Sequence, residues 1–402
     1  MMNNVLFVDD EKNILDGIKR MLRPMRHDFE FFFAVGGVEA LALMEIQPIS
    51  IVVSDMRMPV MSGLQFLTEV QQRFPRTIRI MLSGQADDES IVNTVSVVHQ
   101  FLAKPCEPEA LKDVLKRAAT LYNLMANDQL RAVISGIGNL PSLPSIYAEL
   151  NNALRDAEVS AEDVGKIIEQ DIAMTAKVLQ LVNSSFFGLF QKVDSTARAV
   201  KLLGIDTIKV LVLGAQIFSE LHVKSSLLSL DTLYNHSMAV ANCSKRIARN
   251  CTDDNELIEQ CFIAGMLHDI GKLLLVTQCQ QQYEEVLSET VKENVILVNC
   301  EQKVLQTTHG HVGAYLIGLW GFASNIIEAV AFHNNLEKCP VAGFGPALVV
   351  HVADYAYYLS CPETATGAPP VLNEAYLAEL GMLDGVRDWL KVAEEFYVSL
   401  TE

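Results

Sequence analysis

The sequence lacks the features that mark secreted and membrane-spanning proteins. Its eight cysteines are scattered and include no CxxC pair, which favours free thiols in a reducing compartment over a disulfide framework. The N-terminal stretch MMNNVLFVDD has no basic residues before its short apolar run, unlike a signal peptide. No apolar run approaches the roughly 20 residues that span a bilayer. We therefore expect a cytoplasmic protein without a membrane partner.

Positive charge is also scarce. The formal net charge is -18, of which residues 1–120 carry -3 and residues 121–402 carry -15. Proteins that bind nucleic acid are usually basic, because contacts to phosphate supply much of the affinity. Nucleic acid is therefore a disfavoured partner. With 402 residues, half of them hydrophobic, the chain can form two or three domains with sizeable cores.

The first 120 residues alternate between strand and helix patterns five times. Four apolar runs are predicted to be buried parallel strands: VLFVDD, ISIVVSD, IRIMLSG and QFLAKP. A fifth strand is expected near 29–34, and helices are expected near 11–24, 38–46, 63–73 and 88–97. This alternation predicts an α/β domain over 1–120, built on a doubly wound parallel five-stranded sheet.

Polar residues end these apolar runs: Asp9 and Asp10, Asp55, Ser83, and Lys104 followed by proline. The carboxyl ends of parallel strands converge on one crevice, where open α/β sheets bind ligands. Three carboxylates suit Mg²⁺, which shares oxygen ligands with phosphate. We expect Asp55 to accept a phosphoryl group, Lys104 to neutralise its charge, and Ser83 to donate a hydrogen bond to it. One such residue alone is usually a solvated turn residue, whereas the ordered set is specific.

These residues, together with MRMPVMSG after Asp55, make residues 4–120 resemble the receiver domain of two-component response regulators. The resemblance implies that a histidine kinase phosphorylates Asp55. It also implies that the backbone carbonyl of Arg57 joins Asp9, Asp10 and Asp55 as a ligand of Mg²⁺. By the same resemblance, Ser83 and Phe101 form the conformational switch.

The rest of the chain has mainly helical patterns. A periodic apolar face predicts a connecting helix over 108–133 that extends the last helix of the first domain. The segment GIGNLPSLPS then indicates a domain boundary, so an all-helical domain is expected over 134–402. Its helices are predicted at 145–155, 160–170, 173–183, 195–203, 205–220, 231–249, 256–277, 280–293, 309–319, 324–333, 345–360 and 374–400, with a loop at 361–373.

Six residues of this second region form a candidate metal site: His236, His268, Asp269, His309, His333 and Asp354. Imidazole and carboxylate groups together suit a transition metal such as Mn, Fe, Zn or Ni. The adjacent His268 and Asp269 can serve one metal or bridge two. Lys272 lies one helical turn beyond His268 and could contact a substrate phosphate. The alternative is that these histidines are hydrogen-bonded structural residues, as we interpret His351.

Residues 134–340 resemble an HDOD domain, a relative of the HD-domain phosphohydrolases, and 341–402 form a helical extension. The resemblance is carried by NLPSLPSIYAEL, QDIAMTAKVLQLVNSSFFG, AVKLLGIDTIKVLVL, NHSMAVAN, AGMLHDIGK, HGHVGAYLIGLWGF with the preceding Glu301, and FHNN. It implies an HD-like helical bundle that acts as a signalling output, often without enzymatic activity. The six candidate ligands match positions that HD-type enzymes use for metal. The cyclic-di-GMP phosphodiesterase branch, however, carries a GYP tripeptide that this sequence lacks, and paired histidines where it has His333-Asn334.

Two hypotheses follow for a response regulator with this organisation. In the first, the HDOD domain is an interaction module for an unidentified downstream signalling protein. In the second, it is a receiver-gated, metal-dependent phosphohydrolase that acts on a nucleotide or cyclic dinucleotide. In either case we expect phosphorylation to shift the population of receiver conformations. That shift would change how the receiver or the 108–133 helix packs against the output domain, or against a second copy in a homodimer.

Overall fold

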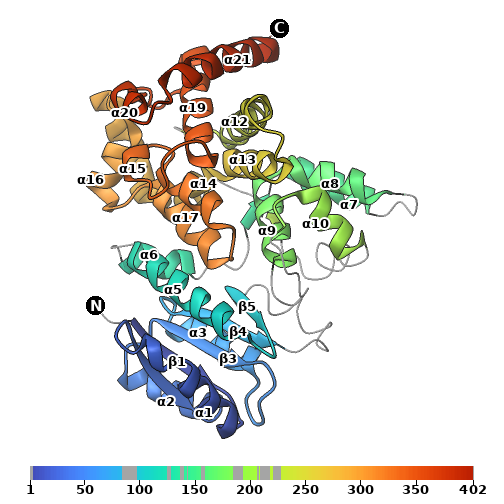
Figure 1. Cartoon of the computed structure of the whole chain (residues 1–402), viewed down its shortest axis with the longest axis vertical. Helices are drawn as coiled ribbons and strands as arrows, with labels where there is room; N and C mark the ends of the chain where they lie inside the picture. Colours follow the sequence, from blue (N-terminus) through green and yellow to red (C-terminus); the bar gives the residue numbers. More distant parts are fainter. Residues whose placement is uncertain are drawn as a thin grey trace.

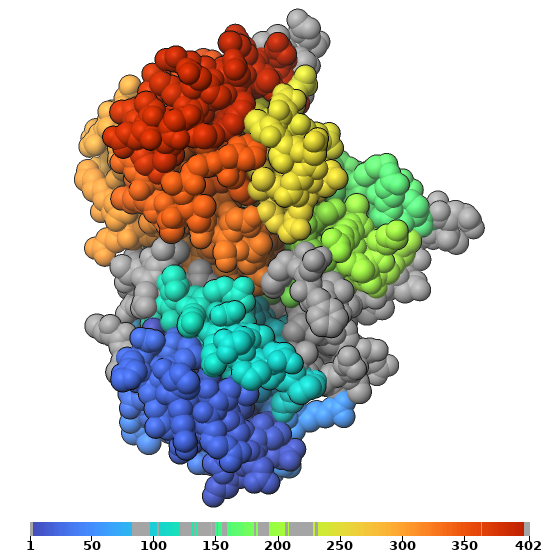
Figure 2. Space-filling view, viewed as in Figure 1, coloured from blue at the N-terminus to red at the C-terminus, as the bar shows by residue number. Residues whose placement is uncertain are grey.

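The computed structural model describes most of the 402-residue chain. The described residues are 3–83, 97–124, 128–135, 140–142, 144–154, 159–183, 193–205, 208, 218–220 and 228–401. An N-terminal α/β domain and a C-terminal helical domain lie at opposite ends of the molecule (Figure 1). In the space-filling view, the blue and teal N-terminal lobe abuts the orange and red C-terminal lobe (Figure 2).

The N-terminal domain contains a parallel sheet with the strand order β2-β1-β3-β4-β5. Its strands are β1 (Asn3–Val8), β2 (Phe29–Ala34), β3 (Ile51–Asp55), β4 (Ile78–Ser83) and β5 (Gln100–Ala103). The described helices are α1 (Lys12–Met21), α2 (Gly37–Ile46), α3 (Gly63–Arg73), α5 (Pro108–Leu124) and the short 3-10 helix η1 (Arg23–Met25). This confirms the predicted doubly wound five-stranded sheet.

Alternation of apolar residues along the strands produces two hydrophobic layers. Val5 and Phe7 point to the face covered by α1 and α5, whereas Leu6 and Val8 point to the face covered by α2 and α3. Both sets are buried because successive side chains of a strand point to opposite faces and both faces carry helices. The helix predicted near 88–97 lies almost entirely outside the described residues.

The predicted connecting helix over 108–133 is described as two helices, α5 and α6 (Asp128–Ser135), and residues 125–127 lie outside the described part. The Arg131 guanidinium lies over the Tyr122 ring, 4.1 Å from its centroid. In one straight helix, residues nine apart lie on opposite faces and about 13.5 Å apart along the axis. The contact therefore means that α5 and α6 do not share one straight axis, so the described residues do not form the single extended helix that was predicted.

The C-terminal domain is a helical bundle, as predicted. Its α-helices are α7 (Pro144–Ala153), α8 (Ala161–Glu169), α9 (Ile172–Val182), α10 (Thr196–Leu203), α12 (Leu230–Cys251), α13 (Asn255–Leu267), α14 (Ile270–Gln278), α15 (Gln280–Glu293), α16 (Leu297–Leu305), α17 (His309–Leu319), α18 (Ser324–Phe332), α19 (Pro346–Ser360), α20 (Glu374–Glu379) and α21 (Leu383–Thr401). The 3-10 helices η5 (Leu336–Lys338) and η6 (Pro362–Thr364) follow α18 and α19.

Several predicted boundaries were wrong. The helices expected at 256–277 and 374–400 are each two helices, and α16 was not predicted. Residues 218–220 form strand β7 (Phe218–Glu220), which pairs in parallel with β6 (Leu140–Ser142), although a helix was expected there. Strands of three residues are too short to show the alternation by which a strand is recognised. No disulfide joins the eight cysteines, all of which lie in the described part of the chain.

One helical stretch of the described residues, Asn255–Gln278, is long and apolar enough to cross a membrane. It is the core of the bundle, because 89% of its apolar window is buried inside the protein. Such a stretch is weak evidence for a membrane span, since buried core helices have the same composition.

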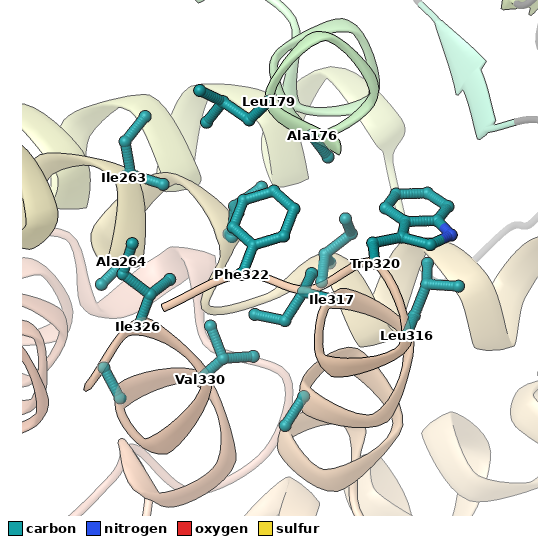
Figure 3. Close-up of a cluster of buried hydrophobic side chains, with 14 of the residues drawn as sticks. Ala176, Leu179, Ile263, Ala264, Leu316, Ile317, Trp320, Phe322, Ile326 and Val330 are labelled. Atoms are coloured by element: carbon teal, nitrogen blue, oxygen red, sulfur yellow. The ribbon is translucent and has the colours of Figure 1, made fainter. Parts of the chain in front are cut away.

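Helix α17 is buried along almost its whole length. Figure 3 shows apolar side chains of α17 and of the turn that follows it facing those of α9, α13 and α18: Ala176, Leu179, Ile263, Ala264, Leu316, Ile317, Trp320, Phe322, Ile326 and Val330. Glycines bring the neighbouring backbones into contact with α17. A Cβ at Gly271 of α14 would lie 1.9 Å from the His309 carbonyl oxygen, and one at Gly310 would lie 2.8 Å from that of Val330. The position of α17 is therefore fixed on both sides.

We predict that Gly271→Ala destabilises the helical domain. The added methyl must displace the His309 backbone, and overpacking of this kind costs about 2 kcal/mol or more. Both tryptophans, Trp320 and Trp389, lie in this domain, so its unfolding in urea can be followed by tryptophan fluorescence.

Gly385→Ala in α21 is the matched control. A Cβ at Gly385 would meet only the Trp389 ring, at 3.9 Å. Because alanine favours a helix more than glycine by about 1 kcal/mol, this variant should be as stable as the wild type or slightly more stable. Equal stability of the two variants would contradict the packing at Gly271.

Candidate functional site

The first candidate site lies at the carboxyl-terminal edge of the parallel sheet. Lys104 follows β5, and its Nζ lies 2.9 Å from Asp9 Oδ2 and 2.5 Å from Asp55 Oδ1. Asp55 Oδ2 accepts a hydrogen bond from the backbone N–H of Arg57 at 3.1 Å. Although partial burial alone would lower the pKa of Lys104, the two carboxylates raise it. The Lys104–Pro105 peptide is cis.

The structure thus brings three of the predicted residues, Asp9, Asp55 and Lys104, into direct contact. Asp10 follows Asp9 and is half-buried. Ser83 ends β4, but its side chain lies outside the described residues. Phe101 is buried on the sheet face that α3 covers. The oxygen donors fit Mg²⁺, which prefers carboxylate oxygen and leaves positions for phosphate oxygens.

The second candidate site lies in the helical domain, where six helices and the residues at their ends supply six buried side chains. These are His236 of α12, His268 and Asp269 at the α13–α14 junction, His309 at the start of α17, His333 just after α18, and Asp354 of α19. Each is at most 5% exposed. The His268-Asp269 pair was predicted to lie within one helix. It lies instead where one helix ends and the next begins, which lets both side chains turn toward the same point.

Hydrogen bonds orient three of the four imidazoles. Their Nδ1 atoms lie next to acceptors: His268 at 2.6 Å from the Gly265 carbonyl, His333 at 2.9 Å from the Val330 carbonyl, and His309 at 2.8 Å from Glu301 Oε2. An Nδ1–H that donates to such an acceptor leaves the Nε2 lone pair available. The Nε2 atoms face each other in pairs: His236 and His268 at 3.1 Å, and His309 and His333 at 3.2 Å.

Glu301 is the most buried support of this arrangement. Its side chain is fully buried, accepts a hydrogen bond from the backbone N–H of His309 at 2.9 Å, and accepts another from the Tyr283 hydroxyl at 2.9 Å. Burial alone would lower the pKa of His309, but the Glu301 and Asp269 carboxylates together outweigh burial and raise it to about 9. Glu301 therefore fixes the orientation of the His309 ring and contributes to its basicity.

The Asp269 carboxylate spans the two imidazole pairs. Its Oδ1 lies 3.2 Å from His309 Nε2, and its Oδ2 lies 3.4 Å from the Nε2 atoms of His236 and His268. Lys272 donates to the same Oδ2 at 2.6 Å. Burial alone would raise the pKa of Asp269, but the neighbouring positive groups hold it well below its usual value.

This donor set fits a metal ion. Two Nε2 lone pairs about 3 Å apart repel each other unless a proton or a metal ion lies between them. The Oδ1 atoms of Asp269 and Asp354 are buried and make no well-directed hydrogen bond, which buried carboxylates rarely tolerate without a cation. Two groups have ligand atoms within 4.8 Å of one another: His236, His268 and Asp354, and His268, Asp269 and His333. Because Asp269 faces both imidazole pairs, the six residues could hold one ion, or two that share its carboxylate.

A cavity of about 60 Å³ adjoins the cluster, which is room for a few water molecules. Four residues of the cluster line it, together with Lys272 and Asn334: His236, Asp269, His309 and Asp354. Further lining residues come from the start of α16, from Tyr357 and Tyr358 of α19, and from the segment 364–370. Part of the segment predicted as a loop at 361–373 thus covers the site.

Sequence reasoning missed Tyr283 and the supporting role of Glu301, which it named only as part of the family resemblance. Tyr283 lies 18 residues before Glu301 in the chain, and no spacing rule connects the two. Asn334, whose amide nitrogen lies 3.0 Å from His309 Nε2, was noted only because it replaces a second histidine. His351 is structural as interpreted, because its ring lies 2.6 Å from the His333 carbonyl.

Two family models match this chain. A model of the response regulator receiver domain matches residues 5–116, and a model of the HDOD domain matches residues 140–336. Asp354 of the metal cluster lies on α19, beyond the second match.

Similar proteins share either part of the chain. An uncharacterized protein from Treponema pallidum (strain Nichols) is 24% identical over 209 residues, which are 52% of this chain and 40% of that protein. The hydrogenase transcriptional regulatory protein HoxA from Cupriavidus necator is 35% identical over 125 residues, 31% of this chain and 25% of HoxA. The chain therefore spans two fifths or less of these curated relatives. The crystal structure of the MmoQ response regulator from Methylococcus capsulatus is 22% identical, covers 63% of this chain and 98% of MmoQ, and has a TM-score of 0.46.

We predict that Glu301→Gln weakens metal binding by about 10- to 100-fold, the usual effect of losing a carboxylate that orients a ligating histidine. The measurement is a Mn²⁺ titration of the full chain, followed by electron paramagnetic resonance of the free ion. Glu285→Gln at an exposed position of α15 is the control and should bind like the wild type. Equal affinities for both variants would remove Glu301 from the site.

Proposed function

Because the chain is a response regulator that joins a receiver domain to an HDOD domain, we propose that it accepts a phosphoryl group on Asp55 and uses it to control its helical output domain. The observation that carries this proposal is Lys104, whose ammonium group contacts both Asp9 and Asp55. This is the arrangement that an acyl phosphate needs, since the lysine can neutralise a phosphoryl oxygen beside the acceptor.

In the proposed reaction, an oxygen of Asp55 attacks the phosphorus of a phosphohistidine on the kinase. A P–O bond forms, the P–N bond breaks, and the electron pair leaves with the imidazole nitrogen. Mg²⁺, when bound by Asp9, Asp10, Asp55 and the Arg57 carbonyl, would balance the charge of the transferred group. Ser83 and Phe101 are the proposed switch. The likeness to receiver domains supports a histidine kinase as donor and a cytoplasmic location.

For the output we propose an HDOD domain that binds a downstream signalling protein and contains a transition-metal centre, with Mn, Fe, Zn or Ni as candidate ions. The convergence of His236, His268, Asp269, His309, His333 and Asp354 supports the centre. In this role the metal would hold the ends of α13, α14, α17 and α18 together with α12 and α19, and so stiffen the surface that the partner binds. A homodimer is a further possibility for this surface.

A second candidate function is a receiver-gated phosphohydrolase. The observation that favours it is the cavity beside the cluster, into which Lys272 and the shared Asp269 carboxylate face. A bound metal would activate water there, and Lys272 could hold a phosphate oxygen. The small cavity disfavours a cyclic dinucleotide, because sites that bury ligands of that size usually have about 300 Å³ or more.

We predict that acetyl phosphate with Mg²⁺ adds one phosphoryl group to the chain, because the attacking carboxylate is already positioned against Lys104. The measurement is intact-protein mass spectrometry. Asp55→Asn should abolish the addition, whereas Asp16→Asn, at an exposed position of α1, should not. A phosphoryl group that persists in Asp55→Asn would overturn the assignment.

For the second candidate we predict that the chain loaded with Mn²⁺ hydrolyses a generic aryl phosphodiester, and that Asp269→Asn removes this activity together with bound metal. Release of the aryl alcohol is followed by absorbance, and bound metal by elemental mass spectrometry. Metal bound at the cluster without turnover under any tested ion would leave the interaction module as the function.

A further inference from the structure

In the described part of the chain, the receiver and the helical domain meet chiefly where α17 packs against α5 (Figure 1). Strand β5, the edge strand of the sheet, adds to this contact at its start. The Gln100 side chain at the start of β5 donates to the Gly318 carbonyl near the end of α17, at 3.0 Å. A strand of the receiver therefore contacts the helix whose first residue, His309, belongs to the metal cluster.

A buried arginine anchors this contact on the receiver side. Arg79 of β4 is 1% exposed, and its guanidinium donates to the carbonyls of Val97, Thr77 and Ser135, the last at 2.6 Å. Ser135 is the final residue of α6. Burial lowers the pKa of Arg79 to about 10, so the group is still charged at neutral pH. The described carbonyl groups that accept hydrogen bonds from this guanidinium are all neutral. Its buried charge is therefore stabilised by hydrogen bonds alone, and the one to the Ser135 carbonyl is important among them.

His99 completes the same contact, and its hydrogen bonds define its tautomer. Its Nδ1 accepts the backbone N–H of Arg79 at 2.9 Å, so Nδ1 carries no proton. The proton of the neutral ring is therefore on Nε2, which donates to the Ser135 carbonyl at 2.8 Å. Burial, and then the nearby Arg79 charge, hold the pKa of His99 well below its usual value. The Ser135 carbonyl oxygen thus accepts hydrogen bonds from two side chains of the receiver, those of Arg79 and His99.

The contact continues into the helical domain through Ser135. Its fully buried hydroxyl lies 2.8 Å from the Tyr315 hydroxyl. Tyr315 lies on α17, six residues after His309. An α-helix of eleven residues is about 16 Å long, so α17 reaches from the receiver contact to the metal cluster. Its glycine contacts and apolar neighbours (Figure 3) leave it little room to bend.

Strand β5 connects the same contact to the phosphorylation site. His99 and Gln100 lie at its beginning, Phe101 lies within it, and Lys104 follows its end. We propose that Arg79, His99, Ser135 and Tyr315 form an interdomain latch that couples phosphorylation of Asp55 to the metal cluster, with β5 and α17 as its two arms. This inference rests on the proposed function, and it names the regulation of that same site.

The latch requires that a change at Asp55 alter α17. When Lys104 and Phe101 move with β5, the preceding residues His99 and Gln100 move with them. The hydrogen bonds that His99 and Gln100 donate to the carbonyls of Ser135 and Gly318 then change. Because tightly packed elements shift as units and do not deform gradually, α17 would move as one body and carry His309 with it. Coupling of this kind is reciprocal, so metal at the cluster should in turn affect the receiver.

The test is hydrogen exchange of the full chain, measured by mass spectrometry with and without acetyl phosphate and Mg²⁺. In the wild type we expect the exchange rate of peptides covering 309–319 to change about five-fold or more, the lower range of ordinary allosteric coupling. The change should be absent in Asp55→Asn. It should also be absent in Ser135→Ala and in Tyr315→Phe, although both still become phosphorylated on Asp55.

Thr290→Val is the matched control, because it removes a fully buried hydroxyl on α15, away from the latch. It should keep the wild-type response. If a latch variant does not fold, Gln100→Leu at the half-buried start of β5 replaces it. Phosphorylation without a change in α17, or a full response in the latch variants, would overturn the latch alone. Absence of any phosphoryl group on Asp55 would instead overturn the proposed function, and the latch with it.

Discussion

The close approach of α14 to α17 is the constraint on which the helical domain depends. Gly271 lies against the His309 carbonyl with no space for a side chain. This contact holds the α13–α14 junction, and with it His268 and Asp269, beside the first turn of α17. Without it, the carboxylate of Asp269 could not face two imidazole pairs. The convergence of the six candidate metal ligands is therefore a consequence of backbone packing, and these side chains are as rigid as the core around them.

The same helix makes the two ends of the molecule dependent on each other. α17 begins in the cluster and ends against β5, so the receiver touches the output through an element that is part of the site. A flexible tether is thus unnecessary for signalling. The buried guanidinium of Arg79 restricts how the domains can move. If Ser135 moves away, a buried N–H group of Arg79 loses its acceptor, and a buried donor without an acceptor costs free energy. This favours two discrete arrangements of the domains over a continuum.

Much of the architecture could be predicted from the sequence because its signals are local. Strand-end polar residues in a parallel sheet must share one edge, and Asp9, Asp55 and Lys104 do so. The six candidate ligands could be named from the resemblance to HD proteins, and they do converge. The change of axis between α5 and α6 and the Glu301–Tyr283 support could not be predicted. They depend on contacts between residues far apart in the chain, for which helical periodicity contains no information.

The sequence by itself determined the two-domain organisation, the parallel sheet and the identity of the groups available for chemistry. Periodicity and residue type suffice for these, since each element buries its own apolar face. The tertiary structure alone decided that His268 and Asp269 lie at a helix junction, and that Glu301 orients His309. It also decided that Arg79 and His99, ordinary in sequence, share one carbonyl between the domains. The reason is physical: the direction of a buried hydrogen bond is set by how separate elements pack together.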